Sequence, residues 1–202
     1  MNDGNTDENV GWPSYVDFLS TFIFLLILFI GCLVFQVSGV IEQHKKKKTL
    51  DDISKDIGGA GIPNYVRQNK IIIPLAEQVN FAPGKSFLDA IAQDHLTRVG
   101  HQIALACADP RIHCKRVMVE GHADNVPVKR DPQFGNLRLS ADRALEVLRF
   151  FYVCGTCGYG PEIRSRLILS GEGDIAAQNL VGGSQQDRRV DVILDFGSEH
   201  DH

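Results

Sequence analysis

One carboxylate stands at the head of a long apolar run near the start of the 202-residue sequence. Asp17 directly precedes residues 18–35, in which Ser20 and Thr21 are the polar interruptions. Desolvation raises the pKa of a carboxylic acid, so an aspartate in this position can be neutral in one state and charged when water or a polar partner reaches it. A proton carrier or an ion-binding group requires this behaviour. The alternative is a side chain that reaches back to the lipid headgroups.

The apolar run predicts a membrane-spanning helix over residues 12–41. Its length meets the requirement of roughly 20 residues for crossing about 30 Å of hydrocarbon, and Trp12 and Tyr15 suit the interfacial aromatic belt. The first eleven residues contain no Lys or Arg, unlike the basic start of a secretory signal peptide. We therefore expect an uncleaved anchor, with residues 1–11 as a cytoplasmic tail.

The residues after the anchor predict one α+β domain. Gly58, Gly59, Gly61 and Pro63 break a helix, so residues 42–68 are expected to be a juxtamembrane helix and linker, and residues 69–202 the domain. Hydrophobic periodicity gives a β-α-β-α-β-β order. The expected elements are a strand at 71–81, a helix at 87–108, a strand at 116–121, a helix at 139–151, and strands at 166–171 and 188–196.

Composition and motifs exclude several classes of function. The formal net charge is −4, and the dense basic stretch Lys45–Lys48 follows the apolar run, so nucleic acid is not an expected partner. The sequence lacks H-E-x-x-H, G-x-S-x-G and the Walker loop. We therefore expect a protein that is not an enzyme and has no cofactor.

Four separated blocks carry a family resemblance. GHADNVPV (121–128), NLRLSADRA (136–144), LILSGEGD (167–174) and DRRVDV (187–192), preceded by VNFAPGKSFL (79–88), resemble the OmpA-like peptidoglycan-binding domain over residues 70–196. The sequence departs from that pattern at Asp187, where the family usually has Asn, and at Val126–Pro127, where a Gly-containing turn is usual. These departures concern loop geometry and leave the fold expectation unchanged.

The resemblance implies a binding pocket for the wall peptide. It assigns diaminopimelate binding to Asp124 and Arg143, and the chemistry fits, because a carboxylate accepts from the ligand ammonium and a guanidinium grips the ligand carboxylate through two hydrogen bonds. The other implied pocket residues are Asn125, Asn136, Leu139 and Arg189. Taken singly, an Asp-Asn pair after a strand is commonly a turn former, and an Arg on a helix is commonly solvated.

The stretch WPSYVDF (12–18), placed before a single spanning helix and an OmpA-like domain, resembles the MotB family of stator subunits. The resemblance implies that Asp17 binds a permeating H⁺ or Na⁺. It also implies that a dimer of this chain stands inside a ring of a multi-spanning MotA-like subunit, anchored to peptidoglycan. The acidic tail and short linker are more similar to the B subunit of Zorya anti-phage defence systems. A flagellar-type stator subunit and a passive peptidoglycan tether without ion conduction are the alternatives.

Two features bear on topology in opposite directions. Lys45–Lys48 follow the helix, and the positive-inside rule then favours a cytoplasmic carboxy-terminal domain. The wall-binding blocks require a periplasmic domain, and the helices of an obligate partner can impose that orientation. We expect a single-pass protein of the bacterial inner membrane with a cytoplasmic N-terminus and a periplasmic domain.

The cysteines suit an oxidising compartment. Cys107 and Cys114 flank a short loop, and Cys154 and Cys157 lie in CGTC, so both close pairs are predicted to form disulfides, with Cys32 free in the membrane. The alternatives are a redox CxxC motif and a zinc site that uses Cys107, His113 and Cys114. We expect no metal.

Overall fold

The computed structural model describes residues 12–75, 79, 81, 85–123, 131, 134–173 and 189–197, without the side chains of 12–14, 172 and 173. The chain divides into two compact units between Lys46 and Lys47. Helix α1 (Trp12–Gly59) begins in the first unit and ends in the second.

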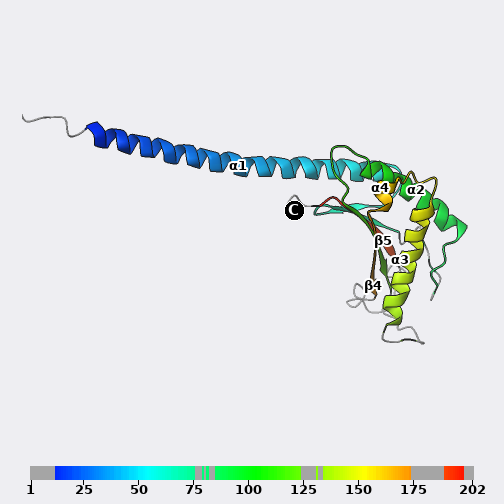
Figure 1. The fold of residues 1–202 in the computed structure, drawn as a ribbon. Coiled ribbons are helices and arrows are strands. Elements are labelled where there is room, and N and C mark those ends of the chain that lie inside the picture. The colour runs from blue at the N-terminus through cyan, green and yellow to red at the C-terminus, as the bar shows by residue number, and fades with distance from the viewer. Residues whose placement is uncertain are drawn as a thin grey trace, which may run out of the picture. The chain divides into compact units, whose positions relative to one another are not determined.

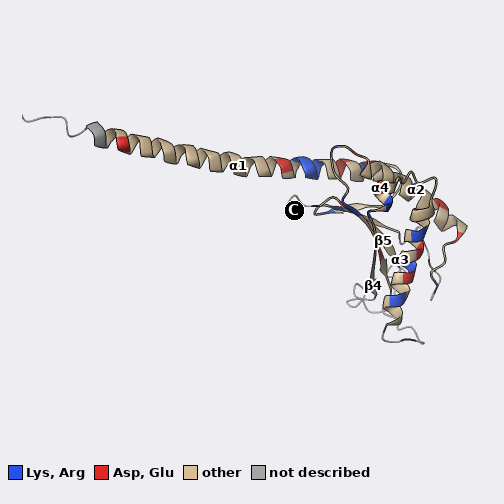
Figure 2. Cartoon of the chain, viewed as in Figure 1, with Lys and Arg blue, Asp and Glu red and all other residues tan. Residues whose placement is uncertain are grey.

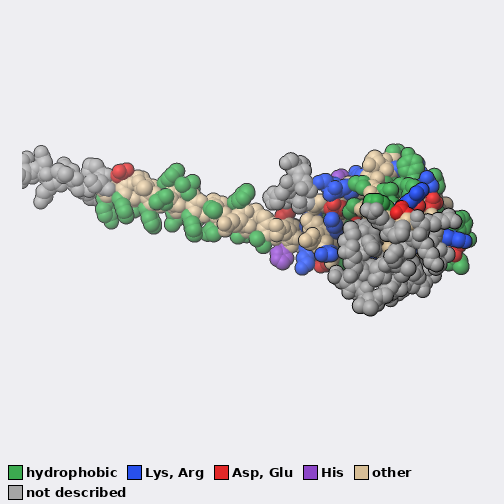
Figure 3. Space-filling model, turned by 90° about the horizontal axis from the view of Figure 1, so that it is seen from below, with side chains coloured by type: hydrophobic (Ala, Val, Ile, Leu, Met, Phe, Trp, Pro, Cys, Tyr) green, Lys and Arg blue, Asp and Glu red, His purple; other side chains and the backbone are tan. Residues whose placement is uncertain are grey.

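The first unit consists of the apolar part of α1, whose side chains are exposed along its length. Phe18, Phe29 and Phe35, for example, are 70%, 63% and 82% exposed. Figure 3 shows apolar side chains projecting from this helix, and no charged residue lies between Asp17 and Glu42 (Figure 2). In the described part of the chain, α1 is the one helix long and apolar enough to cross a membrane. A helix that exposes apolar side chains on all sides requires lipid or a partner around it.

The second unit contains a five-stranded mixed sheet. Its strands are β1 (Tyr65–Arg67), β2 (Lys70–Pro74), β3 (Arg116–His122), β4 (Leu167–Gly173) and β5 (Val190–Asp195), in the spatial order β1-β2-β5-β3-β4. β3 and β4 are parallel, and the other neighbouring pairs are antiparallel. The helices are α2 (Ala90–Cys107), α3 (Gly135–Val153) and the short α4 (Pro161–Arg164), and Figure 1 shows α2 and α3 on the same side of the sheet.

The predicted fold class is confirmed. The expected β-α-β-α-β-β order is the order of β2, α2, β3, α3, β4 and β5. Two short elements were not expected from the sequence, β1 with three residues and α4 with four. The expected start of α3 was also too late, because the helix starts at Gly135 instead of residue 139.

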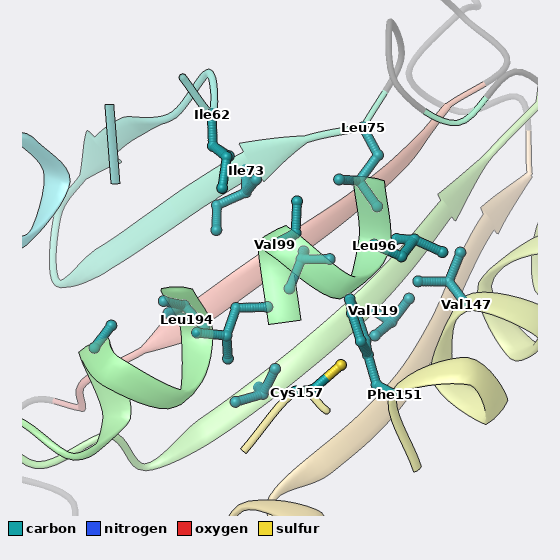
Figure 4. Close-up of a cluster of buried hydrophobic side chains, with 14 of the residues drawn as sticks. Ile62, Ile73, Leu75, Leu96, Val99, Val119, Val147, Phe151, Cys157 and Leu194 are labelled. Atoms are coloured by element: carbon teal, nitrogen blue, oxygen red, sulfur yellow. The ribbon is translucent and has the colours of Figure 1, made fainter. Parts of the chain in front are cut away.

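Strand alternation gives the sheet two different faces. Val190, Val192 and Leu194 of β5 belong to the apolar core, as do Val117 and Val119 of β3. Successive side chains of a strand point to opposite sides, so the residues between them face away from the core. We call this second side the outer face of the sheet. The core is filled by aliphatic side chains from strands and helices, including Leu96, Val99 and Val147 (Figure 4).

The last turns of α1 belong to the same core as the sheet. Leu50, Ile53 and Ile57 are almost fully buried, and Ile62 joins them just after the helix. The expected domain began at residue 69, whereas the compact unit begins at Lys47. The helix does end at the expected glycines, since α1 stops at Gly59 and Gly61 has a φ of 77°.

The structure has both predicted disulfides, Cys107–Cys114 and Cys154–Cys157, with Cα–Cα distances of 4.9 and 5.6 Å. Cys32 is free. Cys157 is fully buried against α2, where a Cβ added at Gly100 would lie 2.6 Å from its sulfur. The second disulfide thus packs beside Gly100 of α2, where the absence of a side chain leaves space for the Cys157 sulfur. Among the described residues, no group of three or more His, Cys, Asp or Glu side chains is placed to hold a metal ion.

Candidate ligand-binding site at the end of β3

The end of β3 meets the start of β5 and the first half of α3. The backbone N–H of His122 donates to the carbonyl of Arg189 at 2.8 Å, and Gly121 is paired with Val190. A Cβ at Gly121 would overlap the backbone oxygen of Ser140, so only glycine permits α3 to approach this closely. The sheet and α3 therefore converge directly before position 124.

Asp124 and Asn125, two of the predicted wall-binding residues, lie outside the described residues. Two others, Asn136 and Leu139, are half-buried on the first turns of α3. Phe134 and Leu137, beside them, are 57% and 46% exposed. The first turns of α3 therefore present both polar and apolar groups near the end of β3.

Arg143 is fully buried, which the sequence analysis did not anticipate. Its Nε donates to the carbonyl of Lys85 at 3.2 Å, and its guanidinium carbon lies 5.3 Å from the centroid of the Phe81 ring. This distance is within the range of a cation–π interaction. Among the described contacts, the guanidinium is therefore held by the Lys85 carbonyl and the Phe81 ring.

Arg189 points to the outer face, where it belongs to a charged cluster. Its Nε lies 3.1 and 3.2 Å from the two carboxylate oxygens of Asp191. The Nε2 of His122 is 3.3 Å from Asp191 and 3.3 Å from Glu120. Arg143 lies on the core side with α3, so the structure places the two arginines on different sides of the sheet.

The electrostatics of this cluster favour a charged imidazole. Burial alone lowers the pKa of His122, but hydrogen bonds to the carboxylates of Asp191 and Glu120 outweigh it and raise the pKa to about 9. His122 is therefore a cation at neutral pH. The sequence analysis quoted this histidine in GHADNVPV without assigning it a role. The sequence signal for this cluster was the presence of charged or titratable residues at alternate positions, 120 and 122 in β3 and 189 and 191 at the start of β5.

A cavity of about 360 Å³ opens on the outer face beside this cluster. Charged groups from the cluster form part of its wall, and the β1–β2 hairpin forms the rest. The lining residues are Tyr65, Arg67, Gln68, Lys70, Ile72, Glu120, His122, Arg189, Asp191 and Ile193. Of these residues, the sequence predicted a role in a pocket for Arg189 alone.

Asp17 lies in the second turn of α1, in the first unit. Its side chain is exposed, and its backbone carbonyl accepts a hydrogen bond from the Ser20 hydroxyl at 2.9 Å. This bond occupies the hydroxyl proton of Ser20 within the helix. The Asp17 carboxylate is thus presented outward from the helix surface.

Comparisons with known proteins agree with this fold. The model of the OmpA family matches residues 80–191, more than half of the chain. A MotB-like protein from Desulfovibrio vulgaris is similar at 22% identity, with a TM-score of 0.55, covering 77% of this chain and 96% of that one. Two structures of the periplasmic domain of Helicobacter pylori MotB show 16% and 14% identity and TM-scores of 0.50 and 0.51. They cover 67% and 69% of this chain, and 89% and 82% of theirs.

A comparison with curated proteins gives no significant match. At these identities the likeness to solved structures establishes the fold, and the family match covers the end of β3, α3 and the start of β5. The family match covers α2, β3 and α3, which contribute to the described core. The chain therefore belongs to the OmpA family.

Proposed function

We propose that this chain is the peptidoglycan-anchored B subunit of a proton- or sodium-driven, MotA/MotB-like motor of the bacterial inner membrane. The observation that carries the proposal is the position of Asp17, at the start of a helix with exposed apolar side chains, in a chain whose other unit is an OmpA-family domain. A passive anchor needs the helix and the domain, but it does not need a carboxylate within the apolar segment.

The proposal requires a membrane partner. A lone carboxylate facing lipid is costly, so Asp17 needs protein or a water-filled path around it. In the described part of the chain α1 is the one helix that could span a membrane, and a single helix cannot enclose such a path. A dimer inside a ring of multi-spanning MotA-like subunits would supply it. The MotB proteins among the similar structures support this choice of partner.

The domain would hold the unit at the cell wall. In this proposal Asp124 and Arg143 bind the ammonium and carboxylate of a diaminopimelate residue, with Asn125, Asn136 and Leu139 around them. Arg189, expected from the sequence to join them, lies instead on the outer face beside Asp191. The convergence of β3, β5 and α3 before position 124 supports the location. Because Arg143 is buried and already contacts Phe81 and the Lys85 carbonyl, ligand binding would have to expose its guanidinium.

The domain would be periplasmic and the N-terminus cytoplasmic. Two disulfides suit an oxidising compartment. Lys45–Lys48 act against this orientation under the positive-inside rule, and the ring partner would have to override them.

We assign the motor to anti-phage defence of the Zorya type. Two features support the assignment, the acidic residues Asp3, Asp7 and Glu8 in the tail and the short connection to the domain. The connection is short because Leu50, nine positions after residue 41, is already part of the domain core. A motility role would be indicated instead by flagellar genes beside this one.

Retention on purified sacculi tests the anchoring half of the proposal. We expect full-length protein in detergent to be retained, and Arg143→Gln and Asp124→Asn to lose most retention, since a broken, desolvated charge pair costs about 2 to 5 kcal/mol. Arg138→Gln, an exposed cation on the same helix, is the matched control and should bind normally. Thermal unfolding of each variant verifies that it is folded. Normal retention of folded Arg143→Gln and Asp124→Asn would refute the pocket assignment.

A further inference from the structure

The β1–β2 hairpin places two cations directly opposite each other. Arg67 and Lys70 are Cα partners in the antiparallel register, and both side chains line the cavity on the outer face. Like charges directly opposite each other on neighbouring strands are destabilising. Neither side chain makes an ion pair or hydrogen bond with another residue in the described part of the chain. On its other side Lys70 faces Asp195 of β5, and the Asp195 carboxylate is paired with Arg116 at 2.8 Å. This row of four charged residues therefore keeps a net positive charge.

The turn between these cations is held in an unusual conformation. Gln68 has a φ of 56°, which is uncommon for a residue other than glycine. The turn is fixed at Asn69, whose side chain donates to the carbonyl of Gly197 at 3.1 Å and whose carbonyl accepts from Phe196 at 3.1 Å. The two cations are therefore carried on a turn that is tied to the end of β5.

The rest of the cavity is arranged in rows across the strands. Two residues along from Lys70, a second row of paired residues crosses the strands. In this row Ile72 of β2 is paired with Tyr65 on one side and with Ile193 on the other. Both isoleucines are less than a tenth exposed, whereas Tyr65 is 49% exposed. The following row contains Asp191 and Glu120, whose carboxylates already hold His122. The cavity therefore runs from a cationic end, over an apolar floor, to a row of carboxylates.

We propose that this cavity binds the free carboxylate end of a short peptide, with Arg67 and Lys70 holding the carboxylate and Tyr65, Ile72 and Ile193 receiving small apolar side chains. The cationic end matches a carboxylate, and the apolar floor matches a body that a bare inorganic anion lacks. One row lies between the Lys70 row and the Asp191 row, so the two are four residues apart along the strand, about 13 Å at ~3.3 Å per residue. An extended peptide of about four residues covers that length.

This site is separate from the proposed wall site at the end of β3, and its ligand does not depend on ion conduction. The probe is the acetylated tetrapeptide of alanine with a free carboxylate, titrated calorimetrically into the full-length protein in detergent. We expect saturable binding, and the peptide with an amidated C-terminus should bind at least about tenfold more weakly because it lacks the charge.

Variants locate the binding. Lys70→Gln and Arg67→Gln should each weaken the affinity about tenfold. The thermal midpoint should change little, because neither side chain is in an ion pair within the described part of the chain. Lys55→Gln, an exposed cation on α1, is the matched control and should bind as the unchanged protein does. Absence of saturable binding, equal binding of the amide, or normal binding by Arg67→Gln and Lys70→Gln would each overturn the proposal. Equal competition by inorganic phosphate would overturn the choice of a peptide.

Discussion

The imidazole of His122 lies 3.3 Å from the carboxylate of Asp191, and the two side chains are 4% and 7% exposed. Asp191 also accepts from Arg189, so one buried carboxylate connects β3 to the residue that precedes β5. Removing one partner of a buried charged cluster leaves an uncompensated charge and is strongly destabilising. The cluster therefore links the stability of the sheet to the protonation of one histidine.

Stability should fall at alkaline pH. The pKa of His122 is raised from 6.5 to about 9 in the folded chain, so its stabilising contribution is complete below about pH 6.5 and is lost as the pH rises through 9. A pKa raised this far corresponds to a contribution of roughly 3 kcal/mol to the free energy of unfolding. We expect the thermal midpoint of the full-length protein in detergent to decrease between pH 7 and pH 10.

Histidine variants separate this effect from other titrations. His122→Asn should lower the midpoint at pH 7 and reduce its decrease toward pH 10. His101→Asn, an exposed histidine on α2, should keep the pH dependence of the unchanged protein. A midpoint that stays constant from pH 7 to pH 10 in the unchanged protein would contradict the role given to His122.

Gly121→Ala should displace α3 from the sheet. The added Cβ would meet the backbone oxygen of Ser140, and backbone cannot yield as a side-chain end can. We expect a loss of about 3 kcal/mol or more in the free energy of unfolding, together with weaker sacculus binding. Gly155→Ala, where a Cβ would meet nothing within 4 Å, should change stability by less than about 0.5 kcal/mol. Equal stability of the two variants would show that α3 does not depend on close contact at Gly121.

Both disulfides should form in cells and stabilise the domain. The chain-entropy estimate gives ~2 to 3 kcal/mol for loops as short as these. Cys107→Ala/Cys114→Ala and Cys154→Ala/Cys157→Ala should each lower the thermal midpoint, and a reductant should do the same to the unchanged protein. Thiol labelling of denatured protein from cells quenched with acid should leave these four cysteines unmodified. Modification of all four would contradict both the bridges and the periplasmic placement.

Local patterns predicted most of the fold. Val190, Val192 and Leu194 are apolar residues at alternate positions, and this signal correctly gave β5 and its core face. The three residues of β1 are too few for alternation to register, and they form a strand because they pair with β2. Leu50, Ile53 and Ile57 have the spacing of one helix face, which is typical of core residues. The glycines that follow them led instead to the prediction of a linker.

The candidate sites depended more on long-range contacts. Motif spacing located α3 and the end of β3, but it could not reveal that Arg143 is buried and contacts Phe81 and the Lys85 carbonyl. The His122–Asp191 pair depends on the register between β3 and β5, which are far apart in sequence. The Arg67–Lys70 pair likewise follows from a hairpin that periodicity did not detect.

The central claim is that Asp17 carries the ion, and Asp17→Asn tests it most directly. The amide keeps the size and hydrogen-bonding capacity of the side chain but cannot cycle between charged and neutral forms. The measurement is phage resistance, or motility if flagellar genes adjoin, in cells that express the variant together with the neighbouring multi-spanning membrane gene. We predict normal membrane assembly and sacculus retention with loss of the biological activity, and partial activity for Asp17→Glu. Full activity of a normally assembled Asp17→Asn protein would contradict the motor and favour a passive tether.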